Sequence, residues 1–560
     1  MGSTSFFPIS VGRLFLALAA PVSLVVSAAP STPAPPTVAE SASRIEADVR
    51  FLADDLLEGR EAGTRGYDLA ALFVATQFRR VGLQPAGEDG TYFQTVPMLR
   101  GTRIRDGAKL VVTRDGHSTD LDFQQDYLPA QTYDSERCAV ELAPMVFVAQ
   151  AVHAPELQQD DFASVDVRGK VAVILRNAPS RFPNDQRAFY ADWDQKAAAL
   201  EQRGAVGVVM LYDPVNEQKR PWDLGAAGWQ RPGMRVAGPD GRPLDTYPGL
   251  RCVAYVRASR ADAFLAGSPH DGAAVFDMLE KGTLRSFELE GRVTMASRTR
   301  IERVTTRNVV GKVAAPANPR AGEHVVLTAH LDHLGVGAPM KGDRIYNGAQ
   351  DNAVGVAAML EAGRLLQSNA STLGRSVLLV ALTAEEKGLL GAQYFVAHPT
   401  VPKPSLVANV NLDMPLTAAE VTDVIPIGIE HSTLEAVAKQ AVTAAGLTLT
   451  RDPLPEEVLF IRSDQYPFVR AGIPSVFLLS GIRREDGKDG LKMLEEFLSH
   501  TYHLPNDDLQ QPIDWLGAAR LAVVNYNIAH AISTQPERPA WKPGDFFGER
   551  FGGGKATPGD

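Results

Sequence analysis

The chain has 560 residues, of which 45% are hydrophobic and 22% are charged, and its formal net charge is -10. This length supplies enough apolar residues for large cores and exceeds one ordinary domain, so we expect two or three globular units. The acidic balance provides no basic excess for a polyanionic partner, which argues against nucleic acid or an anionic membrane.

The N-terminus is typical of an export signal. Arg13 precedes an apolar run at 14–29, and small residues at 26–29 suit signal-peptidase cleavage. A membrane anchor is the alternative, but Pro21 and Ser23 interrupt a run that is already short for a span of about 20 residues. We therefore expect residues 1–29 to be removed, and the mature chain to be periplasmic or extracellular without stable membrane association.

The chain contains two cysteines, Cys138 and Cys252. Export would place both in an oxidising compartment, where an even number favours a disulfide. Two buried thiols are the alternative. Without CxxC spacing, the two residues do not form a metal site by themselves.

Residues 30–136 begin with two predicted helices around a glycine-rich turn, and Gly82 ends the second helix. Helical spacing predicts an apolar face on this second helix, made of Leu69, Leu72, Phe73 and Phe78. We expect residues 30–136 to be a helical N-terminal part that packs on the main domain.

Residues 137–290 have a different pattern. Strand-like segments at 165–175 and 205–213 flank a predicted helix that ends at Gly204, and a loop rich in Pro and Gly follows at 214–249. Because this segment lacks clustered metal ligands, we expect an inserted non-catalytic module.

Residues 291–540 alternate between β and α patterns. Continuously apolar strands are predicted at 308–313, 323–331, 375–386, 406–414 and 474–480, with helices at 352–367, 432–446 and 515–533. Such strands are buried on both faces, which predicts an α/β fold with a mixed, mostly parallel central sheet flanked by helices. The last residues, 541–560, are poor in apolar side chains and are expected to form a flexible tail.

Acids and histidines gather at the ends of the predicted strands, where an open α/β sheet has its ligand crevice. They are His330 with Asp332, Glu385 with Glu386, and Asp413, joined by Asp351 at a helix start and by His500 and His503 further on. Taken alone, Asp351 is better interpreted as a helix cap. Two adjacent carboxylates closing a buried strand are costly unless a cation lies beside them.

Together these residues predict a metal centre with oxygen and nitrogen ligands. Two zinc ions need one shared carboxylate, plus a histidine and an acid for each ion. The residues that fit this requirement are His330, Asp351, Glu386, Asp413 and His503. Glu385 remains free to take a proton from water.

The motifs AHLDHLG, NGAQDNAVG, LTAEEKGLLGAQYF, NLDM, RSDQYPFVRAGIPS and YHLPNDD resemble the M28 family of zinc peptidases and run in the family's order from Thr305 onward. The resemblance implies a zinc exopeptidase fold over residues 291–540, with two Zn²⁺ per chain. It assigns His330 and Asp413 to one ion, Glu386 and His503 to the other, and Asp351 to both. Residues 137–290 similarly resemble an inserted β-rich protease-associated domain.

The same resemblance implies further roles. Asp332 would orient His330, Glu385 would act as general base and then acid, and Tyr502 would donate its hydroxyl to the developing oxyanion. Arg462 would recognise the substrate terminus, or else be a surface arginine paired with Glu457 or Asp464.

Two other histidines compete for roles in the centre. His333 lies next to the metal strand and is more often a packed residue at such a place. His500 competes with His503, but the YHLPND context favours His503.

The expected function is therefore that of an exported di-zinc exopeptidase, most simply an aminopeptidase acting on peptides. A carboxypeptidase or dipeptidase with the same centre is an alternative. A glutaminyl cyclase with one zinc and a non-catalytic receptor-like binding protein are the others, and the complete set of ligands argues against both. The sequence makes no prediction of the oligomeric state.

Overall fold

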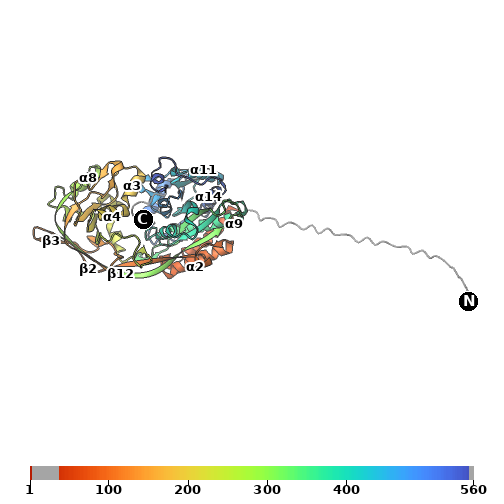
Figure 1. The fold of residues 1–560 in the computed structure, drawn as a ribbon, viewed down its shortest axis with the longest axis horizontal. Helices are drawn as coiled ribbons and strands as arrows, with labels where there is room; N and C mark the ends of the chain where they lie inside the picture. The colour runs from red at the N-terminus through yellow and green to blue at the C-terminus, as the bar shows by residue number, and fades with distance from the viewer. Residues whose placement is uncertain (3–36, 554–560) are drawn as a thin grey trace. The chain divides into compact units, whose positions relative to one another are not determined.

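The computed structural model describes residues 1–2 and 37–553 (Figure 1). The chain divides into the units Met1–Pro36 and Thr37–Asp560, and all helices and strands named below belong to the second. Most of the predicted signal peptide and the last part of the predicted tail, 554–560, lie outside the described residues. No helix in the described part of the chain has both the length and the apolar character needed to cross a membrane.

The central sheet has the predicted mixed, mostly parallel order. Strand β13 (His324–His330) lies between β16 (Ser376–Leu382) and β17 (Leu406–Leu412) and is parallel to both, and β20 (Ser475–Ser480) is parallel to β17. Strand β18 (Asp423–Ile427) pairs antiparallel with β20. Every residue of these five strands is buried. The apolar pattern predicted this for four of them, and β18 was not predicted from the sequence.

Helices cover both faces of this sheet. Alternate side chains of a strand point to opposite faces, so strands that are apolar throughout need packing partners on both sides. On one face, Leu379 of β16 belongs to the same core as α1 (Val38–Leu52), α9 (Val354–Ser368) and α14 (Trp515–Thr534). On the other face, Leu378 packs with α10 (Leu390–Ala397) and α12 (Gln465–Arg470). The predicted α/β fold is confirmed.

Helix α2 (Arg65–Val81) ends as predicted at Gly82, whose φ of 89° is left-handed. The predicted buried face is partly wrong. Phe78 is buried, but Leu69 and Leu72 are 39% and 56% exposed. A neighbouring stripe of Tyr67, Ala70, Ala71 and Val74 is buried instead, because its small alanines allow close approach to β12 and α9.

Two long strands join this part of the molecule to residues 137–290. Strand β2 (Phe93–Arg114) pairs antiparallel with β12 (Phe287–Val313), and Figure 1 shows both running from one part to the other. One end of β12 pairs with β16 and the other with β5 (Arg137–Phe147). The boundary expected at 290 therefore falls inside a continuous strand, and the N-terminal part is helical only as far as Val81.

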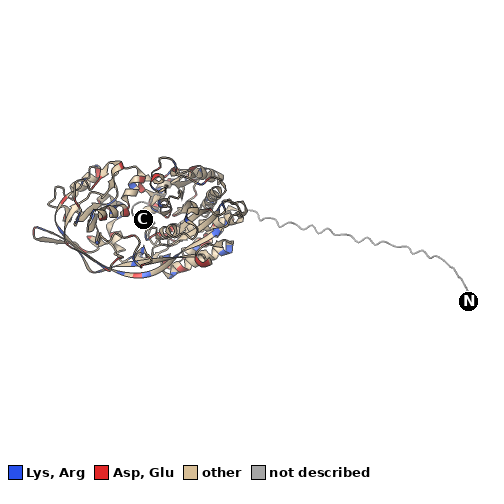
Figure 2. Ribbon diagram, viewed as in Figure 1, with Lys and Arg blue, Asp and Glu red and all other residues tan. Residues whose placement is uncertain are grey.

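Beyond β5 the inserted segment continues as β8 (Val171–Leu175), β9 (Gly207–Leu211) and β11 (Cys252–Val256), which are parallel to one another. Helix α4 (Trp193–Gln202) lies between β8 and β9 in sequence, as predicted. The expected irregular loop is more regular than predicted. It contains α5 (Pro214–Lys219), α6 (Trp222–Ala227) and β10 (Gly233–Val236). Acidic and basic residues are interspersed along the described ribbon (Figure 2).

The expected loose tail contains an ordered helix, α15 (Phe546–Phe551). Phe547 is fully buried, and its ring centroid lies 5.4 Å from that of Phe460. Phe546 contacts Phe189 of α3 (Asn184–Ala191) in the inserted segment, with ring centroids 5.7 Å apart. Aromatic side chains that bury large areas therefore fix residues that composition alone suggested were unstructured.

Candidate metal centre

Three neighbouring parallel strands bring the predicted residues together, because their carboxyl ends meet at one edge of the sheet. His330 is the last residue of β13, Asp413 directly follows β17, and Glu385 and Glu386 follow β16. Asp351 lies in the turn Ala349–Ala353 that leads into α9. His503 lies shortly after α13 (Gly490–His500).

The first donor group consists of His330, Asp351 and Asp413. The His330 Nε2 atom lies 2.9 Å from Asp413 Oδ1 and 3.0 Å from Asp351 Oδ1. The other ring nitrogen lies 3.0 Å from the backbone oxygen of Asp332, which fixes the ring with Nε2 toward the carboxylates. One imidazole nitrogen and two carboxylates are a ligand set that zinc accepts.

The second donor group is built on the other carboxylate oxygen of Asp351 and on Glu386. His503 Nε2 lies 3.2 Å from Asp351 Oδ2 and 3.0 Å from Glu386 Oε2. Asp351 therefore contacts both groups through different oxygen atoms. It caps no helix, since α9 has no side-chain N-cap hydrogen bond, and the cap interpretation of Asp351 is excluded.

His333 also belongs to the second group, although its sequence context favoured a packed residue. Its Nδ1 atom lies 2.7 Å from Glu386 Oε1 and 3.9 Å from Asp351 Oδ2. The short contact between Nδ1 and Glu386 Oε1 does not have the angles of a hydrogen bond, so both ring nitrogens of His333 and the Glu386 Oε1 atom are buried without a hydrogen-bond partner. A cation shared by such orphaned atoms would satisfy them, so the residues present fit a metal ion.

The pKa values of the residues in the centre also favour a bound cation. Burial and Glu386 favour protonated Asp351, but hydrogen bonds from His330 and His503 outweigh them and lower the pKa of Asp351 to about 2. Burial opposes charge on His503, yet Glu386 and Asp351 raise its pKa to about 9. The carboxylates thus demand nearby positive charge, which protons supply in the absence of a metal.

Glu385 stands beside these groups without belonging to either. Burial raises the pKa of its carboxyl group well above the usual value, His330 opposes this, and Asp413 and Glu386 add to it. Its backbone N–H donates to Asp332 Oδ1 at 3.0 Å, which fixes the position of the residue.

The role expected for the Asp332 carboxylate is wrong in one respect. The backbone oxygen of Asp332, and not its side chain, contacts the His330 ring. The chain continues beside β16 after His330, as the Leu331 to Leu382 backbone hydrogen bond shows, so the carboxylate reaches Glu385 instead. Asp332 still supports the centre, through the proposed base.

Several supporting residues were not found from the sequence. Ser463 Oγ donates to Asp413 Oδ2 at 2.6 Å and accepts a hydrogen bond from Asn411 at 2.8 Å. Asp507 accepts hydrogen bonds from the backbone N–H groups of Gln350 and Asp351 at 2.9 and 3.0 Å. The RSDQ and YHLPND motifs contain Ser463 and Asp507, which is the signal that marks them.

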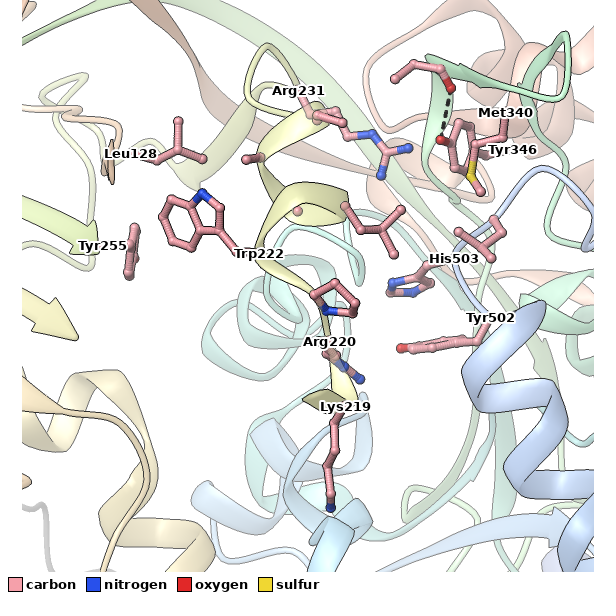
Figure 3. A pocket seen from close by; sticks show the side chains of 18 of the residues that line it. Leu128, Lys219, Arg220, Trp222, Arg231, Tyr255, Met340, Tyr346, Tyr502 and His503 are labelled. Carbon is pink, nitrogen blue, oxygen red and sulfur yellow. Dashed lines mark hydrogen bonds between the residues drawn. The ribbon is translucent and has the colours of Figure 1, made fainter. Parts of the chain in front are cut away.

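Tyr502 stacks on His503 with ring centroids 3.7 Å apart, and both line a cavity of about 580 Å³ (Figure 3). Arg462 lines a different cavity and lies 3.3 Å from Glu457, the surface pairing that was its alternative. His500 is exposed at the end of α13 and contacts its own helix, so it lies outside the centre.

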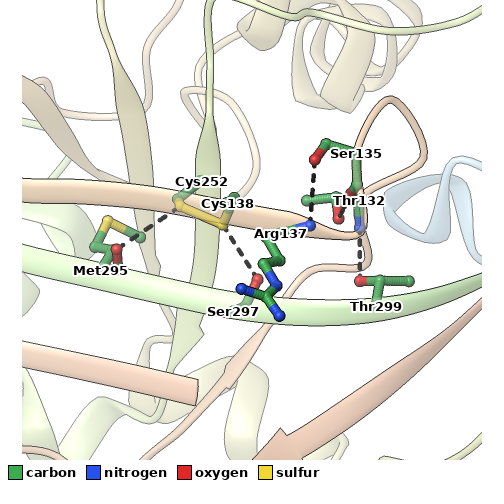
Figure 4. Close-up of a disulfide and its surroundings, with 8 residues drawn as sticks. All are labelled: Thr132, Ser135, Arg137, Cys138, Cys252, Met295, Ser297 and Thr299. Atoms are coloured by element: carbon green, nitrogen blue, oxygen red, sulfur yellow. Dashed lines mark hydrogen bonds between the residues drawn. A yellow bond between two sulfur atoms is a disulfide. The ribbon is translucent and has the colours of Figure 1, made fainter. Parts of the chain in front are cut away.

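The two cysteines form a disulfide between β5 and β11 (Figure 4). Their Cα atoms are 5.7 Å apart, and the bond closes a sequence separation of 114 residues. Cys138 Sγ also lies 3.1 Å from Ser297 Oγ of β12. The disulfide therefore links β5, the first strand of the inserted segment, to β11, whose cysteine follows 114 residues later.

Residues 308–529 match the model of Peptidase family M28. This part of the chain is similar to M28 peptidases and contains both donor groups. Over 224 residues it is 30% identical to Aminopeptidase YwaD of Bacillus subtilis (strain 168), a match that covers 38% of this chain and 44% of that protein. The matched part of the chain thus spans less than half of this curated relative.

Two solved structures are similar to the chain. The aminopeptidase from Aneurinibacillus sp. strain AM-1 has a TM-score of 0.52 at 17% identity, over 90% of this chain and 96% of that chain. BSAP, a zinc aminopeptidase from Bacillus subtilis, has a TM-score of 0.44 at 18% identity, over 88% and 95%. The family resemblance is confirmed, and the first of these structures shares the fold. The protease-associated insert stays a prediction.

Proposed function

We propose that the chain is a di-zinc aminopeptidase, which hydrolyses the N-terminal bond of peptides. The observation that carries this proposal is the shared Asp351 carboxylate, which contacts His330 with one oxygen and His503 with the other. A bridging carboxylate of this kind is what a two-metal hydrolytic site requires. Support also comes from the peptidase family match and from the curated relative, which is named an aminopeptidase.

In this proposal His330 and Asp413 would hold one zinc ion, Glu386 and His503 would hold the other, and Asp351 would contribute to both. His333 offers a further nitrogen to the second ion, since it lies 2.7 Å from Glu386. When bound, zinc polarises a carbonyl oxygen and makes water more acidic.

Glu385 would take the proton of the attacking water and pass it to the departing amine. A buried carboxyl group with a raised pKa is suited to hold a proton between these two steps. The hydrogen bond from its backbone to Asp332 keeps it in place. Tyr502, stacked on His503, would donate its hydroxyl to the developing oxyanion.

The test uses purified protein with its metal counted and follows amino-acid release from aminoacyl anilides and short peptides, with and without a chelator. About two zinc ions per chain and chelator-sensitive release from the amino end are expected. Release from the carboxyl end would indicate a carboxypeptidase, and one ion with cyclisation of N-terminal glutamine would indicate a cyclase. A folded protein that binds no zinc would contradict the proposal.

We also infer that the mature protein is exported to the periplasm or beyond the cell. N-terminal sequencing of the mature protein should then begin near Pro30, after the small residues at 26–29. A mature protein that starts at Met1 would contradict this.

A further inference from the structure

The cavity beside the metal centre is lined by basic side chains and by no acidic ones. It lies between the segment 219–231 and the segment 498–504, and His503 forms part of its wall. Its lining includes the basic residues Arg103, Arg176, Lys219, Arg220 and Arg231, and no carboxylate. This differs from the rest of the described ribbon, where acidic and basic residues are interspersed (Figure 2).

Two of these cations already have partners. Lys219 lies 3.2 Å from Glu457 Oε1. Arg103 donates to the backbone oxygens of Pro129 and Trp229 at 2.6 and 3.1 Å. These contacts occupy one of the three donors of Lys219 and two of the five donors of Arg103.

The other three arginines have free donors. Within residues 37–553, the side chains of Arg176, Arg220 and Arg231 make no ion pair and donate no hydrogen bond that meets the usual geometry. The Arg231 guanidinium lies 4.1 Å from the ring centroid of Tyr346, and its Nε is buried without a partner. Arg176 lies 4.9 Å from the ring centroid of Tyr212. Aromatic rings thus hold these cations while their N–H groups remain available.

The cavity adjoins the reacting centre directly. Figure 3 shows Arg220 and Arg231 on one wall, facing Tyr502 and His503 across the space. The Nε2 atom of this histidine lies 3.0 Å from Glu386, so one ring touches both the donor groups and the cavity. A peptide bond held at the centre would place its neighbouring residues in this cavity. Its volume of about 580 Å³ lies in the range of small-ligand pockets.

We propose that Arg220 and Arg231 bind a carboxylate on the leaving-group side of the substrate, so that the enzyme prefers short acidic peptides. This inference rests on the proposed aminopeptidase function. The carboxylate has two possible sources, the C-terminus of a dipeptide or tripeptide and an Asp or Glu side chain just after the cleaved bond.

The test measures kcat/KM for four peptides. Leu-Gly-Gly and its C-terminal amide test the terminal carboxylate, and Leu-Glu-Gly-amide and Leu-Gln-Gly-amide test the side chain. We expect at least one acidic peptide to exceed its neutral partner about tenfold, as one charge-assisted hydrogen bond allows. The ratio should fall toward one in the R220Q/R231Q variant, mainly through KM. The matched control is R79Q, an arginine on the exposed side of α2, which should keep the wild-type ratio.

The outcomes separate the two proposals. Absence of cleavage of all four peptides by zinc-loaded enzyme refutes the aminopeptidase function. Cleavage of all four at similar kcat/KM overturns the cavity inference alone, as does a preference that persists in R220Q/R231Q. If the double variant fails to fold, R220Q alone decides, because Arg220 is solvent-exposed and makes no ion pair in the described chain.

Discussion

Ser463 should control the affinity of one metal ion without touching it. Ser463 is 2% exposed, and its hydroxyl donates to Asp413 Oδ2 at 2.6 Å. The S463A variant leaves this carboxylate oxygen without its donor, while Asn411 keeps its hydrogen bond to Gln465 at 2.9 Å. A hydrogen bond to a charged group contributes about 1.5–3 kcal/mol. The affinity of the first ion should therefore fall about 10- to 100-fold, as for other residues that support metal ligands.

Zinc titration against a chromophoric chelator measures both affinities in one experiment. The matched control is S475A, which removes another buried hydroxyl that donates to Ile473 at 3.0 Å, outside the centre. We expect S463A to weaken one of the two ions and S475A to change neither, although both variants should lose stability. Unchanged zinc binding in S463A, or an equal loss in S475A, would refute the reasoning.

Three further predictions concern the base, the protons and the disulfide. E385Q should lower kcat about 10²- to 10⁴-fold while metal counting still finds two ions, because Glu385 belongs to neither donor group; loss of metal would contradict this. Without metal the pKa of His503 is raised to about 9, so below that pH protons compete with zinc for this ring. The affinity of the second zinc ion should therefore rise about tenfold per pH unit from pH 7 to 8 and level off above about pH 9. A pH-independent affinity in the same titration would argue against a His503 ligand. The C138S/C252S variant opens a loop of 114 residues, which lowers the free energy of unfolding by about 4–5 kcal/mol in the chain-entropy model, seen as a lower denaturant midpoint with unchanged zinc affinity; an unchanged midpoint would contradict the pairing.

The apolar pattern of the sequence was sufficient to predict the sheet and the place of the centre. Strands β13, β16 and β17 are buried on both faces, so their sequences are rich in Val, Leu and Ala, interrupted only by the buried polar residues Thr328, Asn409 and Asn411. The same pattern could not choose the buried side of α2. Two adjacent stripes there have helical spacing, and contacts with distant β12 and α9 select the one with alanines.

Residues whose role depends on distant partners were harder to predict. Whether His333 packs or binds depends on Glu386, 53 positions later, whose carboxylate lies 2.7 Å from its ring. Asp464 was considered only as a partner for Arg462, yet it is fully buried and neither of its carboxylate oxygens has a hydrogen-bond partner. Burial raises the pKa of Asp464 well above its usual value. No local pattern reports such burial, because strands and loops far apart in sequence create it.

The central claim is that Asp351 holds two metal ions between its donor groups. Anomalous diffraction at the zinc edge, from crystals of the zinc-loaded protein, tests this most directly. Two peaks are predicted on either side of the Asp351 carboxylate, about 3.5–4 Å apart, one beside His330 and one beside Glu386. A single peak, or peaks that do not contact Asp351, would contradict the claim.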